Sequence, residues 1–135
     1  TGMHLKVVCP EGYEPEERVL AECKQIGART GSVVSVTADL GDCAGADILY
    51  TDVWASMGQE KEAEARKKIF APYRIDMDTM AIADPDAVIL HCLPAHYGDE
   101  IDYETSRLPN SAIFDQAENR MHAQKALILH LMGVA

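Results

Sequence analysis

Short runs of apolar and β-branched residues alternate with helical patterns along this chain, and this alternation constrains the fold more than any other feature. Strands that alternate with helices form parallel sheets, because each helix carries the chain back to the start of the next strand. The sequence therefore predicts an α/β fold with a parallel sheet. Strands are expected at residues 3–8, 32–36, 46–51 and 87–90, with two minimal strands at 73–75 and 111–114.

Four helical segments are expected between and after these strands. The first begins near Pro15, which suits a first helical position, and ends at Gly27. Two shorter helices follow at residues 60–70 and 78–83. The last is expected to open with a capping box formed by Asp115 and Glu118 and to run to about residue 132. Its apolar residues cover more than one stripe, so we expect it to pack against two surfaces.

The length and charge of the chain limit what it can do. With 135 residues it fits one domain, and its 12 basic and 22 acidic residues give a net charge of -10. This charge repels phosphate backbones, so nucleic acid is not an expected partner, whereas a small cationic substrate is attracted. No stretch reaches the ~20 apolar residues of a membrane span, and no signal peptide precedes the first strand. We therefore expect a cytoplasmic protein without a membrane partner.

A thiol and two imidazoles follow the strand at residues 87–90. His91, Cys92 and His96 leave the carboxyl end of this strand, which is the edge where ligands bind in open α/β sheets. Cys92 can be a thiolate nucleophile, a metal ligand, or a polar group that positions a substrate. Its spacing lacks the paired ligands of a structural zinc site, so no metal is expected. A buried cysteine beside a half-exposed histidine is the structural alternative.

An acidic residue occupies the equivalent place after another expected strand. Asp52 follows the strand at residues 46–51, so a parallel arrangement brings Asp52 and Cys92 to one edge. Asp52 alone also suits a turn or a helix cap. The loop that continues to Ser56, Met57 and Gly58 has the character of a lid that touches a substrate. Trp54 within this loop is expected to pack rather than to bind.

Arg120 lies early in the last expected helix, where a cation is unfavourable for the helix dipole. An anionic ligand such as a phosphate explains its position, because the guanidinium and the positive helix end act together. The alternative is a surface ion pair with Glu118 or Asp115.

Three of these segments resemble motifs of the ornithine carbamoyltransferase family. They are Asp52-Val-Trp-Ala-Ser-Met-Gly58, His91-Cys-Leu-Pro-Ala95 and Ala117-Glu-Asn-Arg120, and residues 12–15 and 122–126 agree as well. The resemblance covers essentially the whole chain and concerns the ornithine-binding, carboxyl-terminal domain. It implies a three-layer Rossmann-like parallel sheet with helices on both faces. The Ser-Met-Gly loop is its specific part, because related carbamoyltransferases carry other sequences there.

The resemblance also implies an activity and roles for the site residues. The family transfers the carbamoyl group of carbamoyl phosphate to the side-chain amine of ornithine, without a cofactor or a metal. By resemblance Asp52, Ser56 and Met57 hold the amino-acid end of ornithine. Cys92 and Leu93 lie at the carbamoyl group and the reacting amine, and Arg120 binds carbamoyl phosphate. Cys92, Asp52 and Arg120 are therefore the expected catalytic residues.

Two departures from the family pattern qualify this expectation. Tyr97 stands where many bacterial members carry Arg, which removes a charged side chain from that loop. Within residues 1–135 neither the family's Ser-Thr-Arg-Thr-Arg phosphate motif nor its Asp-Gly-Asn-Asn segment is present. We expect a domain without its first strand and helix and without the carbamoyl phosphate domain, inactive alone, and a homo-oligomer in full-length form. The alternatives are a non-catalytic amino-acid-binding module and a carbamoyltransferase for another amine.

Overall fold

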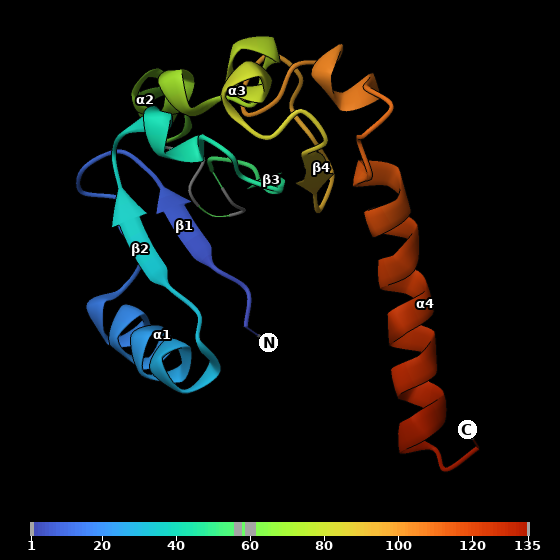
Figure 1. Ribbon diagram of the computed structural model, residues 1–135. Helices are drawn as coiled ribbons and strands as arrows, with labels where there is room; N and C mark the ends of the chain where they lie inside the picture. The colour runs from blue at the N-terminus through green and yellow to red at the C-terminus, as the bar shows by residue number, and fades with distance from the viewer. Residues whose placement is uncertain (1, 56–57, 59–61, 135) are drawn as a thin grey trace.

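The computed structural model describes residues 2–55, 58 and 62–134, and it has the expected alternation of strands and helices (Figure 1). The α/β class with parallel strands is confirmed, and each of the four main strands lies within a few residues of its predicted place. The elements in chain order are β1 (Leu5–Val8), α1 (Glu17–Thr30), β2 (Val34–Thr37), η1 (Leu40–Cys43), β3 (Ile48–Thr51), α2 (Ala63–Phe70), η3 (Ala71–Tyr73), α3 (Met77–Ile82), β4 (Val88–His91), η4 (Thr105–Arg107) and α4 (Ile113–Leu131).

The described strands form two parallel pairs. β1 pairs with β2, in a register that places Leu5 beside Val34. β3 pairs with β4, in a register that ends with Thr51 beside His91. In Figure 1, β1 rather than β2 lies on the side of the β3–β4 pair. The predicted sheet is thus present as two halves, and no strand pairing among the described residues joins the β1–β2 pair to the β3–β4 pair.

The first helix begins and ends later than the sequence predicted, at Glu17 and Thr30. α1 continues past Gly27 to Thr30, and Gly31 ends it with a left-handed φ of 76° and an N–H bond to the Gly27 carbonyl. Gly27 therefore does not end the helix. It allows close packing, because a Cβ there would lie 2.7 Å from the Ser32 carbonyl oxygen. The expected buried face of α1 is only partly covered, since the side chain of Ile26 is 50% exposed.

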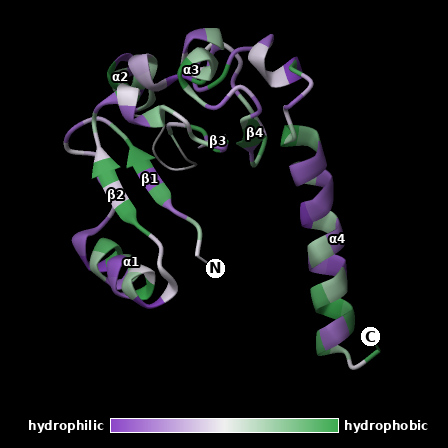
Figure 2. Ribbon diagram, in the orientation of Figure 1, coloured by the Kyte–Doolittle hydropathy of each residue, from purple (hydrophilic) through white to green (hydrophobic). Residues whose placement is uncertain are grey.

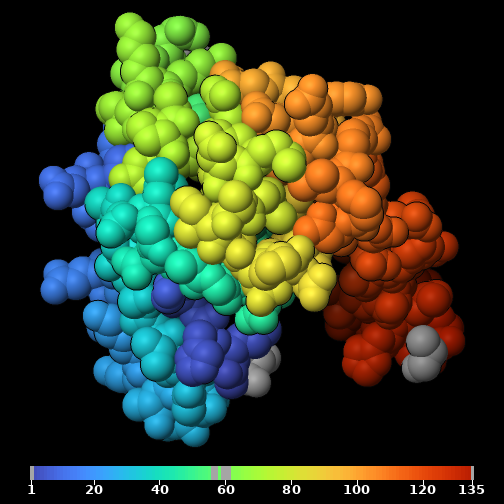
Figure 3. All heavy atoms as spheres, turned by 45° about the horizontal axis from the view of Figure 1, so that its top comes forward, coloured from blue at the N-terminus to red at the C-terminus, as the bar shows by residue number. Residues whose placement is uncertain are grey.

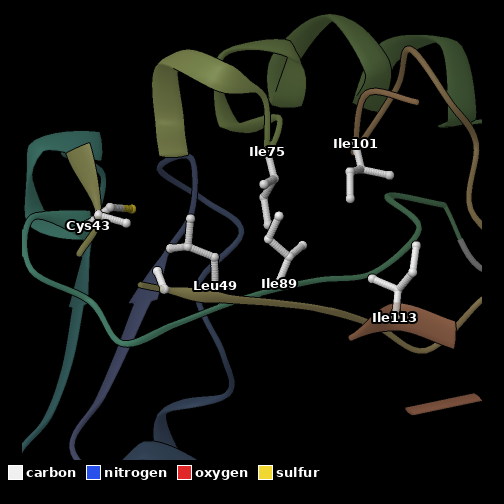
Figure 4. Close-up of a cluster of buried hydrophobic side chains, with 8 residues drawn as sticks. Cys43, Leu49, Ile75, Ile89, Ile101 and Ile113 are labelled. Atoms are coloured by element: carbon white, nitrogen blue, oxygen red, sulfur yellow. The ribbon is translucent and has the colours of Figure 1, made fainter. Parts of the chain in front are cut away.

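The hydrophobic core lies around the second strand pair (Figure 4). Leu49 of β3 and Ile89 of β4 are buried beside one another in the register, and Ile89 is fully buried. Ile75 and Ile101 join this core through an isolated parallel bridge, which replaces the minimal strand predicted at residues 73–75. The buried apolar cluster is completed by Cys43, Ala83, Ala87 and Ile113.

The start of α4 differs from the prediction. The helix begins at Ile113 after Ala112, without a side-chain cap, so Asp115 lies in the first turn and forms no capping box. The strand predicted at 111–114 is reduced to one bridge between Ile89 and Ser111. Packing explains the earlier start, because Ile113 is fully buried and the Ala112 N–H bonds to the Ile89 carbonyl at 3.0 Å. Tertiary burial therefore outweighs the local capping signal.

Most of α4 extends away from the core (Figures 1 and 3). From Glu118 to Val134 every residue is exposed, including Met121 at 52% and Leu131 at 76%. The expectation that α4 packs against two surfaces is wrong for the described part of the chain. Apolar residues nevertheless recur along the helix (Figure 2). The described residues include no helix that is both long and apolar enough to cross a bilayer.

Candidate ligand-binding site at the carboxyl edge of β3 and β4

Asp52 and Cys92 meet at the carboxyl ends of β3 and β4. The register pairs Thr51 with His91, so the next residue of each strand lies at the same edge. The Cys92 thiol donates a hydrogen bond to Asp52 Oδ1, with Sγ and Oδ1 3.0 Å apart. The juxtaposition that the sequence predicted is therefore confirmed.

Cys92 is held in its thiol form. The hydrogen bond to Asp52 is the largest effect that raises the pKa of Cys92, and burial and the negative charge of Asp52 raise it further. A hydrogen bond with the Tyr50 side chain lowers the pKa only in part. A raised pKa disfavours the thiolate that a nucleophilic role requires. Of the alternatives left open by the sequence, a polar group that positions a substrate fits this environment best.

Only one oxygen of Asp52 is bonded by described residues. Its Oδ1 accepts both the thiol of Cys92 and the N–H of Val53, the latter at 2.7 Å. Its Oδ2 has no hydrogen bond from any described residue, and the side chain is exposed. An exposed carboxylate oxygen at a sheet edge suits a cationic group. This geometry agrees with the attraction of a small cation expected from the net charge.

A buried carboxylate supports the residues behind this edge. Glu100, 1% exposed, accepts from His91 Nε2 at 3.1 Å and from the His96 N–H at 2.6 Å. Burial alone raises the pKa of Glu100, but the bonds from His91 and His96 outweigh it and leave this pKa below its usual value. Sequence reasoning missed Glu100, because it lies in a polar segment without periodicity. The one feature that could have drawn attention to Glu100 is the apolar residue that follows it, Ile101, which is fully buried.

Three potential metal-ligand atoms lie close together at this edge. They belong to Asp52, His91 and Cys92 and lie within 4.8 Å of one another. Both ring nitrogens of His91 are engaged, Nε2 with Glu100 and Nδ1 with the N–H of Leu93 at 2.8 Å. A metal ion would have to displace one of these bonds. That no metal binds here therefore stays a prediction. The two hydrogen bonds of the His91 ring favour it.

The loop after Asp52 is anchored by its first residues. The Trp54 ring lies 5.9 Å from the Phe70 ring, so its predicted packing role is confirmed. Arg66 donates to the Trp54 carbonyl at 3.3 Å and forms an ion pair with Glu62 at 3.2 Å. The predicted contacts of Ser56 and Met57 lie outside the described residues.

Arg120 lies apart from the described contacts of the site. α4 begins at Ile113, so Arg120 stands beyond the second helical turn, and the argument from an unfavourable helix start is wrong. Arg120 is exposed and forms no ion pair within residues 62–134, including none with Glu118. Glu118 instead bonds to His122 Nε2 at 3.1 Å. No carboxylate of the described residues pairs with this guanidinium, and an exposed guanidinium suits an anion.

Two residues that the sequence did not single out connect α4 to the edge. Gln116 donates from Nε2 to the Tyr50 hydroxyl at 3.2 Å, and Tyr50 also hydrogen-bonds Cys92. The start of α4 is thus fixed beside the strand ends. Tyr97 lies at the far side of the loop, with its ring 5.3 Å from the Tyr103 ring in an edge-to-face arrangement.

Parallel strands with polar side chains at their carboxyl edge are the arrangement in which α/β domains bind small molecules. Residues 1–131 match the family model described as "Aspartate/ornithine carbamoyltransferase, Asp/Orn binding domain". The chain belongs to the aspartate/ornithine carbamoyltransferase family and corresponds to its amino-acid-binding domain.

Individual relatives agree with this assignment. The ornithine carbamoyltransferase of Parafrankia sp. is 52% identical over 132 residues, which cover 97% of this chain and 42% of the relative. That of Acidothermus cellulolyticus is 50% identical over 135 residues, covering 99% and 43%. The solved ornithine carbamoyltransferase of Pyrococcus furiosus superposes with a TM-score of 0.87 at 47% identity, covering 94% of this chain and 41% of that one. The chain thus spans about two fifths of the length of these relatives.

Proposed function

We propose that this chain is the ornithine-binding domain of an ornithine carbamoyltransferase, which transfers a carbamoyl group from carbamoyl phosphate to the ornithine side-chain amine. The observation that carries the proposal is the bond between Asp52 and Cys92 at the carboxyl edge, within motifs that match the family. The products are citrulline and phosphate.

The site residues take distinct roles in this proposal. Asp52, Ser56 and Met57 hold the amino-acid end of ornithine, and the exposed side chain of Asp52 meets an ammonium group. Cys92 and Leu93 lie at the carbamoyl group and the reacting amine. Arg120 binds carbamoyl phosphate once the partner domain brings that substrate to α4.

The main chemical barrier is the proton on the amine. A lysine-like ammonium has a pKa of about 10.4, so exposing its lone pair at pH 7 costs about 4–5 kcal/mol. Exclusion of water lowers this cost, and the thiol of Cys92 orients the side-chain amine as it loses the proton.

The neutral amine then attacks the carbonyl carbon, a C–N bond forms, and the nitrogen releases its surplus proton to the leaving phosphate. Charge builds on the carbonyl oxygen and then on the leaving phosphate as the C–O bond to phosphate breaks, and Arg120 stabilises that charge. No covalent bond to Cys92 is needed, in agreement with its raised pKa.

The remainder of the enzyme is proposed to complete this domain. Two-stranded parallel sheets rarely stand alone, and β1 and β3 each lack a partner on one edge among the described strands. We propose that a strand and a helix from outside residues 1–135 complete the sheet, and that a carbamoyl phosphate domain supplies the second half of the active site. Homo-oligomerisation belongs to that full-length form. The four unpaired cysteines suit a reducing compartment and support a cytoplasmic location.

A citrulline assay tests the proposal. The 135-residue chain alone should show no turnover, whereas the complete polypeptide that carries it should carbamoylate ornithine. Near-native turnover by the 135-residue chain would contradict the need for a second domain. Failure of the complete polypeptide with ornithine, but turnover with a competing amine, would identify another carbamoyltransferase.

Calorimetry with ornithine separates the remaining alternative. Tight binding of ornithine by the isolated chain, combined with no turnover by the complete polypeptide, would favour a non-catalytic amino-acid-binding module. We expect weak or no binding by the isolated chain, because the site requires both domains.

A further inference from the structure

A buried hydrogen-bonded pair, His91 and Glu100, supports the segment that carries Cys92 and Leu93. His91 is fully buried and Glu100 is 1% exposed, and their side chains are 3.1 Å apart. Burying such groups is unfavourable unless their remaining hydrogen-bonding atoms are satisfied. The partners that satisfy them therefore indicate what the pair does.

The proton on His91 can be assigned from its two neighbours. The N–H of Leu93 can only donate, so His91 Nδ1, 2.8 Å away, must accept and carries no proton. The proton of the neutral ring is then on Nε2, which donates to the ionised carboxylate of Glu100. Glu100 thus selects the tautomer that leaves Nδ1 free to accept from Leu93.

Glu100 also holds the other end of the same segment. Its Oε1 accepts from the His96 N–H at 2.6 Å as well as from His91. One carboxylate oxygen therefore joins the first and last residues of the segment 91–96. Cys92 and Leu93 lie between these two fixed points.

Leu93 needs this support because of its backbone conformation. Its φ is 56°, in the left-handed region that residues other than glycine rarely adopt. It is the only non-glycine with a positive φ among the described residues. Such conformations persist where surrounding bonds fix them, and they cluster at functional sites. The N–H that His91 accepts belongs to this residue.

We propose that Glu100 and His91 are positioning residues that hold Leu93 and Cys92 in the geometry required for carbamoyl transfer. The inference rests on the proposed function for its catalytic consequence. Neither residue is a proton donor or acceptor in the reaction, because both side chains are buried and their polar contacts are within the protein. Their effect is on the placement of the reacting groups.

Two substitutions of His91 separate its two bonds, and both are made in the complete polypeptide. In His91→Asn the side-chain oxygen can replace Nδ1 as the acceptor for Leu93, while the bond to Glu100 is lost. In His91→Gln the amide can replace Nε2 as the donor to Glu100, while the acceptor for Leu93 is lost. We expect kcat to fall about 100-fold in His91→Gln. His91→Asn should retain more activity, and KM for ornithine should change less than kcat in both.

Glu100 is tested by a conservative variant and a matched control. Glu100→Gln keeps an oxygen that accepts from both partners and should retain more activity than Glu100→Leu. Lys67→Gln removes an ion pair of 2.9 Å with Asp99, the neighbour of Glu100, but touches nothing in segment 91–96. Its kcat should equal that of the unmodified enzyme. Equal kcat in His91→Gln, Glu100→Leu and the unmodified enzyme would overturn the proposal.

The tautomer is measured without turnover. NMR of the complete polypeptide with isotope-labelled histidine, with the His91 signal assigned from its loss in His91→Asn, should show the proton on Nε2. A proton on Nδ1 would overturn the proposal even in an active enzyme. If the unmodified polypeptide does not carbamoylate ornithine, the proposed function fails, while the tautomer still decides whether His91 accepts from Leu93.

Discussion

The two strand pairs of this domain have the same topology but different packing. The β3–β4 pair lies in a buried core, with Leu49 at 7% exposure and Ile89 fully buried. Beside the β1–β2 pair, Leu5 is 51% exposed and Val33 is 61% exposed. Apolar burial is the main source of stability. The edge that carries Asp52 and Cys92 is therefore built on the more deeply buried of the two halves.

Truncation of one apolar residue in each half is the strongest test of this contrast. Ile89→Ala should lower the free energy of unfolding by about 2–5 kcal/mol, because it leaves a cavity in the core. Val33→Ala, beside β2, should change it by less than about 0.5 kcal/mol. Urea denaturation measures both. Equal losses in the two variants would show that the halves are equally packed.

The second largest expected effect is on how the free energy of unfolding falls at acid pH, which should depend on a carboxylate beside β4 but not on one in α1. The folded pKa of Glu100 is lowered, so its stabilisation is fully present above the unfolded pKa and is lost as pH falls through the folded pKa. Glu100→Gln should flatten this acid decline and remove up to about 3 kcal/mol at neutral pH. Glu22→Gln, which alters an exposed ion pair of α1, is the control and should leave the profile unchanged. Chemical denaturation at a series of pH values measures the slope, and an unchanged slope in Glu100→Gln would refute the role of this carboxylate.

The smallest expected effect on stability concerns two thiols, the half-buried Cys92 and the buried Cys9. Asp52→Asn removes the main cause of the raised pKa of Cys92, so this pKa should fall, while the free energy of unfolding changes by less than about 1 kcal/mol. The pKa of Cys9 is raised first by burial and then by Glu14, and it should stay unchanged. Ultraviolet titration of the thiolates, with Cys92→Ser to assign the signal, measures both. A Cys92 pKa that does not move would contradict the bond to Asp52.

Where local pattern and tertiary packing agree, the sequence predicted the structure. The apolar run at residues 87–90 gave β4, and the rule for parallel strand ends brought Asp52 to Cys92. The prediction was wrong where tertiary packing favoured a different boundary from the local sequence pattern. Asp115 has the features of a helix cap, but burial of Ile113 moved the start of α4.

Long-range contacts account for the remaining misses. Glu100 lies in a polar segment, residues 99–110, and no periodicity in that segment indicates that Glu100 bonds back to His91 of β4. The apolar residues of α4 predicted a packed helix, but the surfaces that would cover them are not among the described residues. Gly27 has the features of a helix end, and only the approach of Ser32 reveals its packing role.

The pairing of Thr51 with His91 has a consequence for how this domain tolerates insertions and deletions. Side chains alternate between the faces of a sheet, so adding one residue within β3 would turn Leu49 out of the core. The same change would carry Asp52 past Cys92. Length changes that preserve this edge are therefore confined to the connection before β3 and to the part of the connection before β4 that follows the loop of Ser56, Met57 and Gly58. Sequence variants of the domain that keep activity should differ in length only there or beyond the segment 91–101.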